Sequence, residues 1–162
     1  MHHARCQPAN SWCGFGVVEI VIGSALISIA LIGLIAVFQS SLVASREAGR
    51  KITATFLAEE GMEAVRLMRD RSWTNISGLS TTTTYYLTFT GGTWATTTVS
   101  VSTFGTYYRT IRVSDVSRDV SDDIAGSGTW DSGTKKITAD VSWQKRGATT
   151  TISLSSYLAD IF

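Results

Sequence analysis

The side chains that could do chemistry in this chain are carboxylates, and several of them gather in one polar segment. This segment contains Asp115, Asp119, Asp122, Asp123 and Asp131. Carboxylate oxygens are the ligands that calcium prefers. Asp119, Asp122 and Asp123 are therefore candidate ligands of a calcium ion, and the alternative is an acidic loop in water. Their spacing lacks the pattern of an EF-hand loop, and the sequence gives no sign of the cleft that a glycosidase carboxylate pair requires. We therefore expect a solvated acidic loop with no bound metal or cofactor.

Histidine and cysteine occur only at the start of the chain, at His2, His3, Cys6 and Cys13. The remaining residues therefore lack the partners for a Ser/His/Asp or Cys/His nucleophile and for a His or Cys metal site. We expect the protein not to be an enzyme. Its formal net charge is +1 and it has no basic run, so we predict no nucleic-acid partner.

Glu19 is an isolated acid at the beginning of a long apolar stretch. A charged side chain at the centre of a membrane-spanning helix costs about 2.5–3.5 kcal/mol on insertion scales, so this carboxylate requires a nearby cation. No Lys or Arg occurs between Arg5 and Arg46. Cleavage after Gly14 would instead make Phe15 the N-terminus, with its ammonium group four residues before Glu19. Glu19 thus indicates that cleavage of the chain creates the ammonium group with which its carboxylate pairs.

The segments that must position Glu19 are a leader and a long helix. Residues 1–14 are polar and contain the only Pro of the chain, which indicates a leader peptide. Residues 15–38 are predicted to form a transmembrane helix. After Glu19, residues 20–38 are an uncharged apolar run of about 19 residues, which is long enough to cross a bilayer. Residues 39–71 continue this helix with an amphipathic pattern, so that one helix covers 15–71 and its second half packs on its own sheet. The residues that recur at helical spacing in this half are Leu57, Gly61, Val65 and Met68.

The predicted membrane helix carries several small side chains on its surface. They are Gly23, Ser24, Ser28, Ala30, Gly33 and Ala36. Residues of this size let apolar helices approach closely. They are also common in any membrane helix, so a packing surface and an ordinary membrane span both stay open as interpretations.

Residues 72–162 are predicted to form an antiparallel β-sheet domain of about four or five strands. The composition changes there to Thr, Ser, Tyr and Gly, and the pattern changes to alternation. The Gly91-Gly92 pair between two short strands indicates a first hairpin. A longer strand over 106–116 follows, and a second hairpin ends the chain. Between them, the polar and Gly-rich residues 118–134 are expected to form a surface loop.

Alternation within these strands predicts which side chains share a face. One face of the long strand carries Tyr107, Arg109, Ile111 and Val113, and one face of the next strand carries Ile137, Ala139, Val141 and Trp143. We expect the second group to face the helix. The aromatic residues of the domain are expected mainly in the core and in cross-strand pairs. The alternative is an aromatic face for a surface, a sugar or single-stranded DNA.

The residues around Glu19 carry a resemblance to a known family. The sequence Gly-Phe-Gly-Val-Val-Glu at residues 14–19, followed by a long apolar run, resembles the cleavage and methylation signal of type IV prepilins and of type II secretion pseudopilins. The amino-acid sequence of the helix is most similar to that of minor pilins and minor pseudopilins. The resemblance implies cleavage after Gly14, N-methylation of Phe15, and a pilin-like fold with one long N-terminal helix on an antiparallel sheet.

The same resemblance implies the partners and the location of the protein. In that family a prepilin peptidase removes the leader, and an inner-membrane assembly platform builds related pilin subunits into a helical filament. The carboxylate at the position of Glu19 meets the N-terminal ammonium of a neighbouring subunit. The precursor would then be a single-pass protein of the cytoplasmic membrane, in contact with lipid, and the assembled form an extracellular or periplasmic filament.

Two alternatives use the apolar run differently. It could be a secretion signal cleaved near Val43-Ala44-Ser45, or a plain single-pass anchor for a β-domain that acts as a binding module. The excess of Arg46, Arg50 and Lys51 over Arg5 favours, by the positive-inside rule, a cytoplasmic sheet domain. Neither alternative accounts for Glu19. The mass of the mature chain distinguishes a prepilin, a secreted domain and a membrane anchor.

Overall fold

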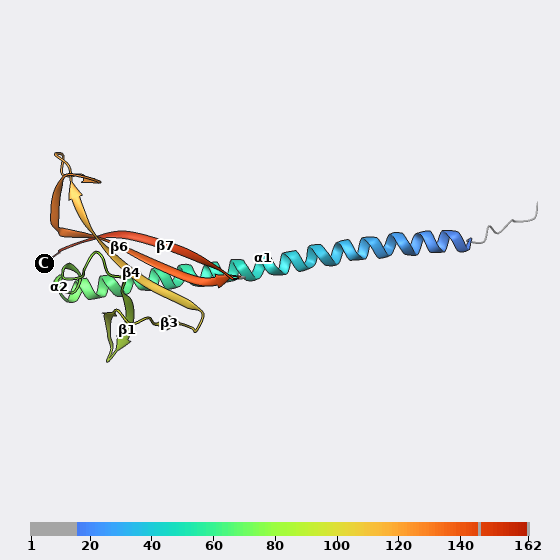
Figure 1. Ribbon diagram of the computed structural model, residues 1–162, viewed down its shortest axis with the longest axis horizontal. Helices are drawn as coiled ribbons and strands as arrows, with labels where there is room; N and C mark the ends of the chain where they lie inside the picture. Colours follow the sequence, from blue (N-terminus) through green and yellow to red (C-terminus); the bar gives the residue numbers. More distant parts are fainter. Residues whose placement is uncertain (1–15, 146, 162) are drawn as a thin grey trace, which may run out of the picture. The chain divides into compact units, whose positions relative to one another are not determined.

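The computed structural model describes residues 16–145 and 147–161. It confirms the predicted α+β class, in which one long N-terminal helix precedes antiparallel strands (Figure 1). The chain divides into two compact units, Met1–Arg46 and Glu47–Phe162. The first unit holds the N-terminal part of helix α1, and the second holds the rest of α1 together with the strands described below.

Helix α1 spans Val17–Arg71 and has 55 residues. Its first part is rich in Val and Ile, which are mediocre helix formers in water, but in an apolar medium a helix satisfies every backbone hydrogen bond within the segment. Its second part has a buried stripe of residues at helical spacing, as predicted. The buried residues are Ala54, Leu57, Ala58, Gly61, Met62, Ala64, Val65 and Met68. This side of the helix packs on the sheet.

The C-terminal end of α1 is tied to the turn that follows it. The short helix α2, Thr74–Ser77, comes directly after α1. The side-chain amide of Asn75 donates a hydrogen bond to the carbonyl of Met68 at 2.9 Å, which satisfies one of the carbonyls that a helix end leaves open. Ile76 is fully buried in the core, so the turn is anchored by packing as well.

The first hairpin forms where the sequence predicts it, but it makes a sheet of its own. Strand β1, Tyr86–Thr90, pairs with β2, Thr93–Thr97, across Gly91 and Gly92, whose φ angles are +61° and +75°. Two successive positive φ angles define the tight turn that matches strand twist, and glycine adopts them without strain. An isolated bridge between Tyr85 and Ile111 links this hairpin to the main sheet. The predicted antiparallel sheet is therefore confirmed for the later strands, whereas the first hairpin, expected to belong to it, pairs with it only through that bridge.

The main sheet has five antiparallel strands in the order β3-β4-β6-β7, with β5 paired to β4. The strands are β3 Ser102–Thr103, β4 Tyr107–Arg118, β5 Ile124–Ala125, β6 Thr129–Lys145 and β7 Ala148–Ala159. The long strands run beside the second half of α1 (Figure 1). Ile111 of β4 stands opposite Ala139 of β6, which in turn stands opposite Leu154 of β7. This register places the predicted apolar rows of β4 and β6 on one face.

The segment 118–134, expected to be a surface loop, does lie mostly at the surface, but about half of it is strand. Strand β5 and the first part of β6 lie within it, and the β4–β6 register shifts between Asp115 and Val116. The prediction failed because pairing here depends on a bulge and on an ion pair between Arg118 and Asp131, at 2.7 Å. Gly128 permits the close approach of the two strands, since a Cβ there would lie 2.1 Å from the carbonyl oxygen of Arg118.

The core lies between the buried stripe of α1 and the facing row of the main sheet. Two clusters of apolar side chains make it up. The fully buried large side chains are Trp143, Ile76, Ile111, Ile137, Val65, Val113 and Val141. The predicted helix-facing row of β6 is confirmed, because each of its four members is buried. Burial of each large apolar side chain contributes about 1.5–3 kcal/mol, so these contacts fix the second half of α1 on the sheet.

Candidate functional site

Glu19, the residue that the sequence places at the centre of function, lies in the first turn of α1. Its backbone N–H donates to the carbonyl of Gly16 at 3.0 Å, and its side chain is exposed. The predicted cleavage and methylation residues, Gly14 and Phe15, lie outside the described residues, as does the rest of the predicted leader 1–14. The structure therefore describes the acid but not the terminus proposed to pair with it.

The carboxylate of Glu19 forms no ion pair or hydrogen bond with any other residue that the structure describes. The helix itself offers partial compensation, because the amides of a first turn carry a fractional positive charge that favours an acid by about 0.3–1 kcal/mol. At the centre of a membrane-spanning helix a charge costs more than this, about 2.5–3.5 kcal/mol. In a membrane, the carboxylate would therefore need a partner cation from outside the described part of the chain.

Three of the predicted small residues lie on the same face of α1 as Glu19. At about 100° per residue, Gly23, Ala30 and Gly33 lie within about 40° of Glu19 around the helix axis. A Cβ added to Gly23 or Gly33 would meet no atom within 4 Å, so this face is open to an incoming helix. Ser24, Ser28 and Ala36 point elsewhere, about 100° or more away from Glu19 around the axis.

The two serines are suited to apolar surroundings even though they lie off that face. Ser24 donates its hydroxyl hydrogen to the carbonyl of Val21 at 2.9 Å, and Ser28 donates to the carbonyl of Ser24 at 2.8 Å. Both hydroxyl groups are thereby satisfied within the helix, so neither requires water. The first unit can thus be surrounded by lipid or by other helices without an unpaired hydroxyl donor at these positions.

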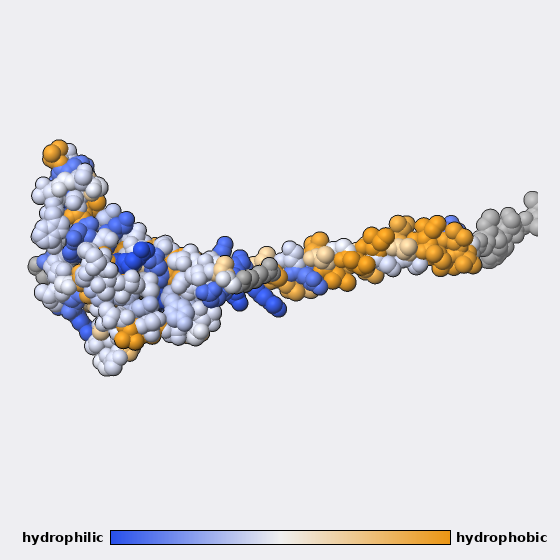
Figure 2. Space-filling model, in the orientation of Figure 1, coloured by the Kyte–Doolittle hydropathy of each residue, from blue (hydrophilic) through white to orange (hydrophobic). Residues whose placement is uncertain are grey.

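The first part of α1 exposes large apolar side chains along its length, and the face of it seen in Figure 2 is mostly hydrophobic. Val17, Ile27 and Phe38, spread along it, are 78%, 63% and 62% exposed. By length and composition this helix could cross a membrane, and none of its most apolar stretch is buried by the chain itself. An apolar surface of this extent indicates contact with lipid or with another protein.

The acidic segment does not gather its carboxylates around one point. Asp119 uses Oδ1 to accept hydrogen bonds from the backbone N–H groups of Ser121 and Asp123, at 2.8 and 3.1 Å. Asp122 has a φ of +66° and lies 3.6 Å from Arg118. Among the described residues, no group of three or more His, Cys, Asp or Glu side chains is arranged to hold a metal ion. The local contacts of these acids are those of a structured turn.

Two acids beside this turn are held in ion pairs that shift their titration. The Nε of Arg118 donates to Asp131 at 2.7 Å, and this bond lowers the pKa of the Asp131 carboxyl. The hydrogen bond from the ammonium of Lys135 likewise lowers the pKa of Asp115, next to the bulge. Both pairs join neighbouring strands, so they stabilise the irregular part of the sheet. Sequence reasoning missed them, because only the register of β4 and β6 brings the partners together.

Comparison with models of known protein families gives no match for this chain, and comparisons with curated proteins and with solved structures give none either. The architecture is pilin-like, with a long apolar N-terminal helix whose second half packs on a C-terminal antiparallel sheet. This arrangement is compatible with a pilus subunit.

Proposed function

We propose that this protein is a structural subunit of a type IV pilus or of a related pseudopilus, and a minor rather than a major one. The observation that carries the proposal is Glu19, an acid without a partner among the residues that the structure describes, on the small-residue face of an exposed apolar helix. The resemblance of residues 14–19 to the prepilin signal and the pilin-like architecture support it. The chain itself catalyses nothing and is the substrate of a prepilin peptidase.

In this proposal the precursor is stored in the cytoplasmic membrane through the first part of α1. Removal of residues 1–14 creates an ammonium group on Phe15, which is then N-methylated. An assembly platform in the membrane delivers the mature subunit to a growing filament, whose other members are related pilin subunits. The filament lies in the periplasm or outside the cell.

Assembly then rests on helix packing and on one ion pair. The exposed apolar side chains of α1 pass from lipid into contact with neighbouring helices, and Gly23, Ala30 and Gly33 allow those helices to approach. The carboxylate of Glu19 receives the N-terminal ammonium of the adjoining subunit. In such a desolvated pair the loss of one partner strands the other, which costs about 3–5 kcal/mol.

The mass of the mature chain tests this proposal directly. The chain is purified from membranes and measured intact. We expect a protein that begins at Phe15 and carries one added methyl group. A chain that begins near Arg46 would instead indicate a secreted domain, and an uncut chain would indicate a membrane anchor; either result would refute the proposed processing. A low abundance in sheared filaments, relative to another pilin, would support the assignment as a minor subunit.

A further inference from the structure

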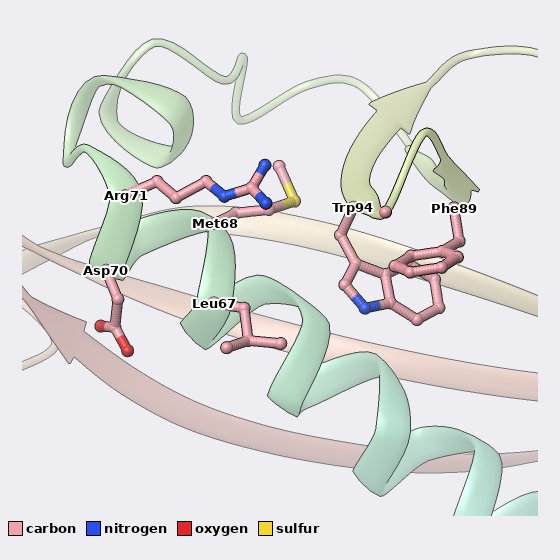
Figure 3. A pocket seen from close by; sticks show the side chains of 7 residues that line it. Leu67, Met68, Asp70, Arg71, Phe89 and Trp94 are labelled. Atoms are coloured by element: carbon pink, nitrogen blue, oxygen red, sulfur yellow. The ribbon is translucent and has the colours of Figure 1, made fainter.

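A cleft opens between the C-terminal end of α1 and the β1–β2 hairpin (Figure 3). Its volume is about 350 Å³, and its lining residues are Leu67, Met68, Asp70, Arg71, Phe89, Gly92 and Trp94. Ligand pockets in proteins span about 300–1,000 Å³, so the cleft has room for one small ring. The filament function proposed above involves the other end of α1 and leaves this cleft without a role.

The hairpin side of the cleft is an aromatic platform. The rings of Phe89 and Trp94 have centroids 5.0 Å apart and are tilted by 54°. Phe89 is 60% exposed, although an aromatic side chain normally gains stability from burial. Phe89 therefore offers the cleft an apolar surface that the described chain leaves mostly uncovered.

A buried cation lies against the ring of Trp94. The guanidinium carbon of Arg109 lies 5.4 Å from the centre of the Trp94 ring, and Arg109 itself is only 6% exposed. Arg109 is fixed in turn by hydrogen bonds to Glu60, at 2.6 Å, and to the carbonyl of Leu57, at 3.1 Å. A platform anchored to the core in this way is organised before a ligand arrives, which reduces the entropy lost on binding.

The helix side of the cleft presents a positive charge. Arg71 extends from the end of α1 toward the hairpin, while Asp70 points away from Trp94 (Figure 3). The carboxylate of Asp70 is engaged by Arg69 at 2.7 Å. Arg71 forms no ion pair or hydrogen bond with any residue that the structure describes. The charge available to a ligand in the cleft is therefore that of the Arg71 guanidinium.

We propose that this cleft binds a carboxylated sugar residue, of the uronic acid class. The guanidinium of Arg71 would pair with the ring carboxylate, a geometry for which its fork of donors is suited. The apolar face of the sugar ring would pack on Phe89 and Trp94. Leu67, which also lines the cleft, is 53% exposed. The site is therefore open to solvent, and a sugar can keep its outward hydroxyl groups in water there.

Other ligand classes fit these features less well. Single-stranded nucleic acid requires a track of cations along its backbone, whereas one arginine faces this cleft and the chain has a net charge of only +1. A wholly apolar ligand would leave Arg71 unpaired and would remain half exposed to water. A carboxylate on a ring uses both the charge and the aromatic surface.

Calorimetric titration of the full chain in detergent micelles tests the proposal. The probes are α-1,4-linked trigalacturonate and the same trisaccharide with its carboxyl groups reduced to alcohols. We expect the wild-type protein to prefer trigalacturonate. Arg71→Gln should weaken trigalacturonate binding by about tenfold or more, with little effect on the reduced trisaccharide. Phe89→Ala should weaken binding of both probes, because both pack on the ring.

The matched control is Lys51→Gln, which removes an exposed cation elsewhere on the same helix; it should bind like the wild type. Arg71 and Phe89 are both exposed, so neither variant should prevent folding, and circular dichroism checks this. Equal binding of the two trisaccharides by the wild type would overturn the proposal, as would equal binding by Arg71→Gln and Lys51→Gln. Tighter binding of oligothymidylate, lost in Arg71→Gln, would replace it with a single-stranded DNA site.

Discussion

The side chain of Arg109 crosses directly over Gly61. A Cβ on Gly61 would lie 2.9 Å from Cδ of Arg109, and the guanidinium beyond it donates to Glu60 at 2.6 Å. The absence of a side chain at position 61 thus lets an arginine from β4 reach the exposed side of α1. The same guanidinium supports Trp94 on the hairpin, so this one crossing joins the helix to both sheets.

Gly61→Ala should destabilise the second unit. Cδ of Arg109 cannot move aside easily, because its guanidinium is held by Glu60 and by the carbonyl of Leu57. Overpacking of this kind costs about 1–3 kcal/mol, offset in part by a gain of about 1 kcal/mol from replacing a helical glycine. We expect a net loss of about 1 kcal/mol in thermal unfolding followed by near-ultraviolet circular dichroism.

Gly49→Ala is the matched control, because a Cβ there would meet no atom within 4 Å. It should raise the free energy of unfolding by about 0.5–1 kcal/mol through helix propensity alone. If the two variants shifted the melting temperature in the same direction, the crossing of Arg109 over Gly61 would not be a tight contact in solution.

Glu60→Gln should cost more stability than the same change at Glu63. Glu60 is half exposed but pairs with a guanidinium that is 6% exposed, whereas Glu63 pairs with Arg66 where both side chains are open to water. Removal of a partner from a buried cation strands that cation, but exposed pairs contribute only about 0–1 kcal/mol. We expect about 1–2 kcal/mol for Glu60→Gln and less than about 0.5 kcal/mol for Glu63→Gln. Chemical unfolding of both variants measures the difference, and equal losses would contradict it.

The contact between Arg109 and Gly61 shows which features of the fold the sequence predicts and which it does not. Alternation in β4 correctly places Arg109 on the same face as Ile111, and the helical stripe correctly includes Gly61. Neither pattern says that the arginine uses the space left by the glycine, because that contact joins residues 48 positions apart. Local periodicity predicts which residues share a face of a helix or strand, but the packing of these elements in the fold decides which faces are in contact.

The ion pair between Arg118 and Asp131 predicts a loss of stability in acid. The bond lowers the pKa of Asp131 below its ordinary value of 3.8, so the unfolded state binds protons at a higher pH than the folded state. The contribution of the pair is therefore fully present above about pH 5 and is lost as the pH falls through the folded pKa.

Asp131→Asn should be less stable than the wild type near neutral pH, and the two proteins should converge as the pH falls toward 3. The slope of stability against pH should be shallower in the variant but not zero, because Asp115 has a lowered pKa as well. Urea unfolding between pH 3 and pH 7 provides the measurement. Parallel curves for the two proteins would show that Asp131 does not carry the effect.

Ala30→Leu should impair filament incorporation more than Ala25→Leu. Ala30 lies about 20° from Glu19 around the axis of α1, whereas Ala25 lies about 120° away. A larger side chain on the face proposed for helix packing keeps neighbouring backbones apart, but both variants stay apolar enough to enter a membrane. Blots of sheared filaments and of membrane fractions measure both properties. Equal incorporation of the two would remove the Glu19 face from the packing surface.

The candidate assembly site at Glu19 is proposed from the sequence alone, because its signal is local. An acid without a cation within reach along the chain is visible in the order of residues alone, and so is the apolar run that follows. The cleft beside Trp94 was not predictable in the same way. Its walls come from α1 and from a hairpin that the sequence assigned to one continuous sheet, and the separation of that hairpin is a result of tertiary pairing.

Glu19→Val should leave the leader peptide cleaved and the protein in the membrane, but should abolish incorporation into filaments. Valine removes the cost of a charge in an apolar layer, so the monomer should be at least as well inserted as the wild type. In the filament, however, the ammonium of a neighbour would then be buried without a partner, at a cost of about 3–5 kcal/mol. Each 1.4 kcal/mol is a factor of ten in an equilibrium, so a loss of this size reduces incorporation by more than a hundredfold. Glu19→Asp is the matched control, because it keeps the charge and shortens the side chain by one methylene; it should retain partial incorporation. Immunogold labelling of filaments and mass measurement of the membrane pool separate assembly from processing. Normal incorporation of Glu19→Val would exclude the ion pair as the basis of assembly, even if the chain were still found to begin at Phe15.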